Sequence, residues 1–275
     1  MSPTKTTLSV VQTGSRLPEP SVARRVDREM FLLLGGTAAL LMQVAHPLVA
    51  AGVAQHSDFR TDPMGRLRRT LDTTLAVVFG DDRTVARAIG HMNRIHTAVR
   101  GVAAGGRAYE ALDPALLLWV QTTLVLSSLR LYEQVMGPLA AADREAYWSE
   151  TKPIAEALGI PRDRLPPTLA DLERYEREML QREVIPDPTS RTVAHDILRP
   201  LRWLPDPVHW PSDAMAAALL PRSLRDRLGL RYGTAERLFF RGAIVAVRWL
   251  RRMLPDLLTV VPQARRYERA SHRQG

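Results

Sequence analysis

Apolar residues recur at helical spacing along most of the chain, in runs separated by short polar breaks. One run follows Asp62-Pro63, a pair that combines a helix-capping aspartate with a proline suited to the first turn. A second run starts at Asp81 and continues to Gly101. We find no alternation of period two that is long enough for a strand, so the pattern predicts an all-α fold. The apolar stripe of the first run, which ends before Gly80, consists of Leu67, Leu71, Leu75 and Val78.

Two segments are almost free of charge. Met30–His56 contains no Lys, Arg, Asp or Glu and has the length of a membrane span. It contains more polar residues than a single transmembrane helix usually does. We therefore interpret it as a buried core helix, kinked near Pro47, in preference to a transmembrane helix. The second segment follows an Asp113-Pro114 cap and is broken by Pro138, and we expect it to be buried as well.

The chain is expected to form one domain. We predict a flexible polar arm over 1–22, a helical domain over 23–260 and a flexible basic tail over 261–275. Within the second half of the domain we expect short helices near 143–158 and 168–181, a Pro/Trp-rich connector over about 186–212, and a helix from about 234 to 254.

The positive charge is concentrated at the C-terminus. The net charge is +9, and the residues after 221 carry 13 arginines against four acids, so the first 221 residues are neutral overall. A neutral body argues against nucleic-acid binding. The basic, aromatic-bearing helix near 234–254 either contacts an anionic membrane peripherally or packs on the core with its arginines reaching water. The N-terminus lacks the pattern of a secretory signal, so we expect a cytoplasmic protein.

The residue types exclude several kinds of site. The chain has no cysteine, so disulfides, zinc–thiolate sites and iron–sulfur clusters are ruled out. No glutamate is followed by a histidine three residues later, as a helical di-iron site requires, and there is no Gly-x-Ser-x-Gly motif. A metal would therefore be held by histidine, by carboxylates or inside a macrocycle.

Two histidines lie in apolar segments, His46 in the uncharged run and His96 in the stripe that follows Asp81. A lone buried histidine is most often a core residue bonded to a carbonyl. Arg100, however, lies one helical turn beyond His96, and a cation beside an apolar cavity needs an anionic partner. Haem supplies two carboxylates on an otherwise apolar disc, so a haem site and a core histidine both remain open. A further basic and hydroxyl cluster on the neighbouring helix consists of Arg66, Arg69 and Thr70.

Several ordered motifs resemble one family. The strings AHPLVAAGVAQHSDFRTDPMGRLRRTLDTTLAVVFG, NRIHTAVRG and LDPALLLWVQTTLV are similar to the bacterial branch of the family that contains the rubber oxygenases (latex-clearing proteins) and the mycophenolic-acid-pathway oxygenase MpaB. The similarity covers roughly residues 28–260. It implies an all-helical fold with a globin-like core, haem b bound through one histidine, and oxygen-dependent attack on an alkene.

The resemblance also assigns roles to residues. The family's His-x-x-x-Arg motif matches His96 and Arg100, which implies His96 as the iron ligand and Arg100 at the cofactor. Its distal motif matches Arg66, Arg69 and Thr70, which implies that they line the oxygen side or hold a propionate. Rubber oxygenases have lysine in place of Arg69, and arginine and histidine in place of Asn93 and Gly101.

The resulting hypothesis is a haem b-dependent oxygenase that uses O2 on an apolar, unsaturated, isoprenoid-like small molecule. His46 is a further candidate on the distal side, as acid/base or as hydrogen-bond donor to bound oxygen. Two alternatives stay open: a haem-binding sensor or carrier without turnover, and a cofactor-free helical protein whose C-terminal arginines bind acidic partners.

Overall fold

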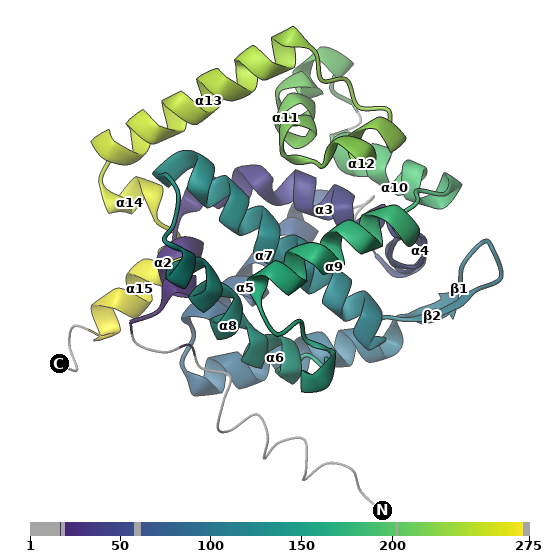
Figure 1. Cartoon of the computed structure of the whole chain (residues 1–275), viewed down its shortest axis with the longest axis horizontal. Coiled ribbons are helices and arrows are strands. Elements are labelled where there is room, and N and C mark those ends of the chain that lie inside the picture. Colours follow the sequence, from purple (N-terminus) through teal and green to yellow (C-terminus); the bar gives the residue numbers. More distant parts are fainter. Residues whose placement is uncertain (1–16, 18–19, 58–61, 202, 272–275) are drawn as a thin grey trace, which may run out of the picture.

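Helices surround one long central helix, α7 (Pro114–Met136), which threads the molecule (Figure 1). The computed structural model describes residues 17, 20–57, 62–201 and 203–271. Over these residues the only sheet has two short strands, so the predicted all-α class is confirmed. The predicted N-terminal arm lies mostly outside the described residues.

The core is built on α7 because its sequence is apolar on every face. Trp119 and Leu129 are fully buried, and the Trp119 indole Nε1 donates a hydrogen bond of 3.2 Å to the Met42 carbonyl. Asp113 caps its N-terminus by accepting from the Ala115 amide, as predicted. Among the described helices α7 alone is long and apolar enough to cross a membrane, and 61% of its apolar window is buried inside the fold.

The uncharged segment near the N-terminus is not one kinked helix. It forms a 3-10 helix, η1 (Met30–Gly35), followed by α3 (Gly36–Val44) and α4 (Pro47–His56). The part before the break and α4 meet at 106°. The predicted position of the break was close, but the chain turns sharply instead of bending within a continuous helix. Both α3 and α4 pack against α10.

Two capped helices then form an antiparallel pair, α5 (Pro63–Phe79) and α6 (Asp82–Ala98), joined at Gly80. Each predicted cap is present: Asp62 accepts from the Gly65 amide and Asp81 from the Thr84 amide. The chain continues into a hairpin of β1 (Arg100–Val102) and β2 (Ala108–Glu110), which contacts α4. This hairpin was not predicted, because three-residue strands carry too little periodicity.

The second half contains more helix than expected. The two predicted short helices are α8 (Ala141–Ala157) and α9 (Leu169–Arg182), with a 3-10 turn η2 (Arg162–Arg164) between them. The expected connector over 186–212 is wrong: this stretch contains α10 (Pro188–Leu198) and the start of α11 (Asp206–Leu219). Pro188 and Pro207 occupy first turns, where the missing amide is not needed, Pro211 is tolerated inside α11, and Pro200 lies between the two helices.

The C-terminal region ends in four helices: α12 (Arg222–Arg227), α13 (Thr234–Met253), α14 (Asp256–Thr259) and α15 (Pro262–Ser271). The expected helix near 234–254 is α13. The expected flexible tail is instead helical over α15, which packs against α5 and buries Ala264 completely. Helix α2 (Val22–Asp27) lies beside it, and the Arg24 guanidinium sits 4.3 Å from the Tyr267 ring centre.

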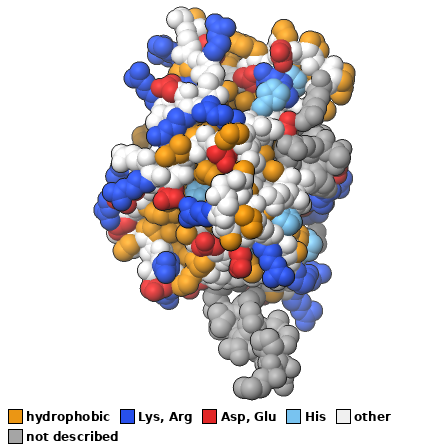
Figure 2. Space-filling view, turned by 90° about the vertical axis from the view of Figure 1, so that its right-hand side faces the viewer, with side chains coloured by type: hydrophobic (Ala, Val, Ile, Leu, Met, Phe, Trp, Pro, Cys, Tyr) orange, Lys and Arg blue, Asp and Glu red, His pale blue; other side chains and the backbone are white. Residues whose placement is uncertain are grey.

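Basic side chains do not gather on the face of the molecule that carries the β-hairpin end. Figure 2 shows them there interspersed with acidic and apolar side chains. This distribution agrees with the neutral charge of the body of the chain.

Candidate functional site

His96 lies near the C-terminal end of α6, where the helix leaves the core. Val85 and Ile89, in the first half of the helix, are buried against the rest of the bundle. Beyond them the packing thins: His96 is half-buried and its neighbour Ile95 is 49% exposed. The predicted apolar stripe is therefore fully buried only over its first half, while Met92 and Val99 in the second half are partly buried.

The imidazole of His96 carries a buried nitrogen that the fold does not use. Its Nδ1 is buried and has no hydrogen-bond partner among the described residues. Burial lowers the pKa of His96, because removing water penalises the charged ring. The ring is therefore neutral at neutral pH, which is the state in which histidine binds a metal.

Two apolar side chains close to His96 in the sequence are left uncovered. Ile95, which precedes His96 on α6, is 49% exposed, and Val102 on β1, six residues after His96, is 57% exposed. Uncovered apolar surface beside a neutral imidazole is suited to a flat, apolar ligand that binds through one axial bond.

Asn93 lies one turn before His96 on α6. Its Nδ2 donates a hydrogen bond of 3.1 Å to the Ala157 carbonyl at the end of α8, which ties α6 to that helix. Its Oδ1 is buried and lacks a partner in the described part of the chain. Residues three apart share a helix face, so two buried polar atoms without a described partner lie on the same side of α6.

Arg100 is not one helical turn beyond His96, as we expected. Helix α6 ends at Ala98, and Arg100 is the first residue of β1, paired with Glu110. Its side chain is exposed, and its carbonyl contacts His56 Nε2 at 3.1 Å. The helical spacing was extrapolated past the end of the helix.

A polar cluster beside this strand was missed by sequence reasoning. The Tyr109 hydroxyl on β2 donates a 2.7 Å hydrogen bond to Gln55 Oε1, and Gln55 Nε2 donates to the Val102 carbonyl. A β-carbon at position 101 would lie 2.7 Å from Gln55 Oε1 and 2.8 Å from the Tyr109 hydroxyl oxygen. A side chain at position 101 would therefore require the ends of the Gln55 and Tyr109 side chains to shift, and Gly101 leaves this cluster undisturbed.

The predicted distal residues lie on α5, in the half of the helix that is level with His96 across the α5–α6 pair. Arg69 and Thr70 are exposed, and the Arg69 guanidinium forms a 2.9 Å ion pair with Asp62. The hydrogen bond from Arg69 lowers the pKa of Asp62 and keeps this carboxylate charged. Arg66 belongs to the same helix, but its side chain lies outside the described part of the structure.

His46 is placed differently from His96. It is the N-cap of α4, 3% exposed, and its Nδ1 accepts a hydrogen bond of 3.2 Å from the Leu48 amide. Burial lowers its pKa, so the ring is neutral and can act as this acceptor. The fold uses this histidine as a helix cap, and its role on the distal side stays a prediction.

A third buried histidine, His209 on α11, was not singled out from the sequence. It is 6% exposed and its Nε2 has no partner among the residues described. The described residues contain no group of three or more His, Cys, Asp or Glu side chains that could hold a metal ion. A cavity of about 670 Å³ is lined by residues that include Lys152, Glu156 and Arg162, and none of the predicted site residues borders it.

Comparison with known proteins gives a family match over most of the chain. The family model described as "ER-bound oxygenase mpaB/B'/Rubber oxygenase, catalytic domain" matches residues 23–249. Two mycobacterial proteins are similar over 230 residues at 26% identity, which covers 79% of this chain and 88% of each relative. They are "Uncharacterized protein Rv2237" of Mycobacterium tuberculosis and "Uncharacterized protein Mb2261" of Mycobacterium bovis.

Proposed function

The chain belongs to the family of MpaB and rubber-oxygenase catalytic domains, and on this basis we propose that it is a haem b-dependent oxygenase that uses O2 to attack an apolar, unsaturated small molecule. The family supports an oxygenase. The haem, its ligand and the isoprenoid-like substrate are the proposed refinements.

The observation that carries the proposal is the environment of His96. Burial lowers the pKa of the ring so that it is neutral, its buried Nδ1 lacks a partner among the described residues, and Ile95, next to it in the sequence, is exposed. A porphyrin supplies four of the iron's ligands, so a single histidine meets the need without any cluster of protein ligands. When bound, haem b would supply the iron centre at which O2 is activated.

The basic residues nearby have roles that suit this cofactor. Arg69 is held by an exposed ion pair with Asp62, and such pairs are weak because water screens them. Its guanidinium can therefore exchange to a haem propionate or to the oxygen side. Arg66 and Thr70, on the same helix, would likewise contact a haem propionate or the oxygen side. Arg100, exposed on β1, would pair with a propionate at the rim.

The test begins with haem reconstitution of the purified protein and an absorption spectrum. We expect a Soret band in the wild type and its loss, or a large drop in haem occupancy, in His96→Ala. The matched control is His209→Ala, which removes the other buried histidine with an unpartnered ring nitrogen in the described structure and is expected to retain haem. A His96→Ala protein with full haem and an unchanged ferrous–CO spectrum would refute the assignment.

Turnover is measured separately, as steady O2 consumption with a terpenoid alkene. Consumption that depends on both haem and alkene would support the oxygenase. A stable Soret band without any O2 consumption would instead identify a haem-binding sensor or carrier. A folded protein that stays colourless after reconstitution would contradict the haem proposal altogether.

A further inference from the structure

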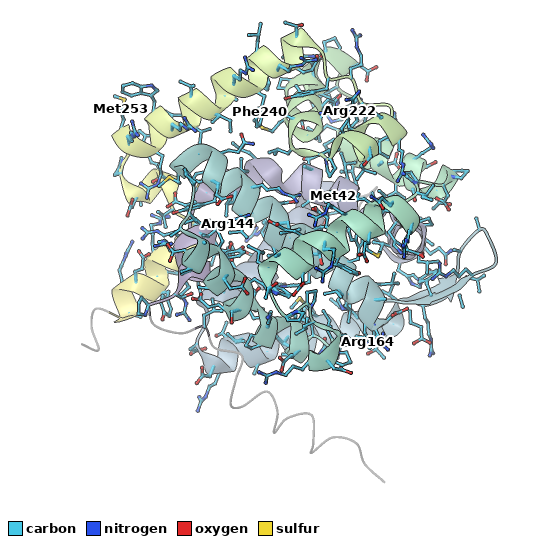
Figure 3. The ribbon with its side chains drawn as sticks, in the orientation of Figure 1. Met42, Arg144, Arg164, Arg222, Phe240 and Met253 are labelled. Atoms are coloured by element: carbon cyan, nitrogen blue, oxygen red, sulfur yellow. The ribbon has the colours of Figure 1, made fainter. Side chains whose placement is uncertain are left out.

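Helix α13 packs on the bundle through one narrow face. Phe240 and Ile244 on that face are buried, and the helix contacts α7 and α11. Near its C-terminal end, Arg251 Nε donates a 2.6 Å hydrogen bond to the buried carboxylate of Glu29. In Figure 3 Phe240 points toward the bundle, whereas Met253, at the end of the helix, points away from it.

The opposite face of α13 carries a row of large apolar side chains in water. Leu238, Val245, Trp249 and Met253 recur at helical spacing and are 62%, 51%, 60% and 74% exposed. Gly242 fills the remaining position of the row. A second apolar stripe on a helix that already buries one stripe is unusual, because single exposed apolar residues are common but contiguous ones mark contact sites.

The apolar row continues onto the next helix. Leu257 and Leu258 on α14 are 62% and 56% exposed, and Leu254 between the helices is 36% exposed. Helix α14 follows α13 directly and lies by its C-terminal end (Figure 1), so these leucines add exposed apolar surface beyond α13. We call the exposed apolar side chains of the two helices the ridge.

Arginines run directly beside this apolar row. Each of the four exposed arginines on this side of α13 occupies the position before a member of the row, so the two rows are parallel along the helix. They are Arg237, Arg241, Arg248 and Arg252. Arg237 stacks on Tyr232, and Arg248 donates to the Gln134 carbonyl of α7. Arg241 and Arg252 form no ion pair with any described residue.

We propose that the outer face of α13, together with α14, docks onto the surface of an anionic lipid bilayer. A helix that lies in a membrane interface needs an apolar face to bury among the acyl chains and cations level with the headgroups, and these two rows supply both. A tryptophan within the apolar row suits the boundary between lipid and water.

The charges favour a bilayer over a second copy of this chain. In a symmetric dimer that pairs the two copies of α13 antiparallel, the row of arginines on one copy would approach the row on the other. Like charges brought together in this way oppose association. Anionic headgroups neutralise the row instead.

Co-sedimentation with vesicles tests the proposal, using the full chain without haem so that the outcome does not depend on the oxygenase assignment. We expect binding to vesicles of phosphatidylcholine with phosphatidylglycerol, little binding to phosphatidylcholine alone, and weakening with salt. Arg241→Gln with Arg252→Gln should lower partitioning roughly 25-fold, at about fivefold per arginine near an anionic surface. Trp249→Ser with Met253→Ser should abolish binding that persists at high salt.

Matched controls lie elsewhere on the surface. Arg83→Gln with Arg162→Gln removes the same charge, and Val102→Ser removes an apolar side chain that is 57% exposed. Both should bind anionic vesicles as the wild type does, with unchanged circular dichroism in every variant. Equal losses in the control and ridge variants, or full recovery of the wild type in the supernatant with both lipids, would overturn the proposal. So would concentration-dependent dimerisation abolished by Trp249→Ser, because the ridge would then be a self-association surface.

Discussion

The break between α3 and α4 and the C-terminal end of α6 each bury a neutral histidine, and they use it in different ways. At the break, the His46 ring accepts a hydrogen bond from the Leu48 amide and so completes the first turn of α4. At the end of α6, the His96 ring has a buried nitrogen without a described partner. Desolvation lowers the pKa of both rings.

The difference separates a histidine that holds the fold from one that we propose is available to a ligand. A buried polar atom without a partner costs free energy, so each such atom calls for an explanation, such as a bound water, an ion or a ligand. The surroundings differ as well, because apolar side chains of α3 and α10 enclose the His46 region, whereas His96 is only half-buried and Ile95, next to it in the sequence, is exposed. Burial alone would have ranked His46 above His96 as the candidate ligand-binding histidine.

The largest expected effect on stability is that of His46→Ala. Removing the ring leaves the buried Leu48 amide without its acceptor and opens a cavity, which together should cost about 2–4 kcal/mol of unfolding free energy. Urea denaturation measures this cost, and haem uptake should be retained. An unchanged denaturation midpoint would show that the cap contributes nothing and would break the contrast between the two histidines.

Gly101→Ala should cost about 0.5–1 kcal/mol, because the added methyl meets Gln55 Oε1 and the Tyr109 hydroxyl at less than van der Waals distance, and the exposed Gln55 side chain can move aside. The substitution tests the packing described near His96, because Gly101 lies on β1, five residues after His96 in the chain. The control is the same substitution in a Gln55→Ala, Tyr109→Phe background, where most of the cost should vanish. Equal costs in both backgrounds would exclude the clash as the cause.

The pH dependence of stability offers a finer comparison. A histidine whose pKa is lower in the folded state binds its proton more readily when the chain is unfolded. Its contribution to the free energy of unfolding is therefore present above the unfolded pKa near 6.5 and is lost as pH falls below it. Asp27 opposes this trend: burial raises its pKa to about 7, so the folded state binds a proton first and stability falls as pH rises toward 7. Urea melts from pH 8 to pH 5 should therefore be compared in an Asp27→Asn background.

In that background, we expect acidification to destabilise the protein, and the loss should be smaller after His96→Ala. The amide oxygen that Asp27→Asn introduces can still accept the 2.8 Å hydrogen bond that Tyr147 donates to Asp27 Oδ1, so the background should remain folded. Identical pH profiles with and without His96 would show that its ring is solvated and not desolvated.

The smallest expected effect is that of His96→Ala on the haem-free protein, within about 0.5 kcal/mol of the wild type. Deleting a ring that satisfies no hydrogen bond removes an unsatisfied buried atom together with some packing, and the two changes oppose each other. Thermal unfolding without haem measures it. A loss as large as that of His46→Ala would mean that His96 also holds the fold.

Local chemistry determined much of this protein from its sequence. The caps at Asp62, Asp81 and Asp113 were all placed correctly, because a capping carboxylate and the amide it binds are two or three residues apart. The all-α class follows from helical periodicity in the same way. The family was also readable in the order of the motifs, which the match over residues 23–249 bears out, while the role of His96 in the motif stays a prediction.

Contacts between residues distant in the sequence decided where the helices end and which neighbours pack against them. Helix α6 stops at Ala98 because the next residues pair with Ala108–Glu110, and that pairing moved Arg100 from a helix face to a strand. Prolines near 188 and 207 opened helices instead of interrupting them, since α3, α4 and α13 were there to pack against. The sequence of α13 contains both apolar stripes, but only the packing of α7 and α11 on one of them left the other in water, because a helix buries the face that its neighbours present to it.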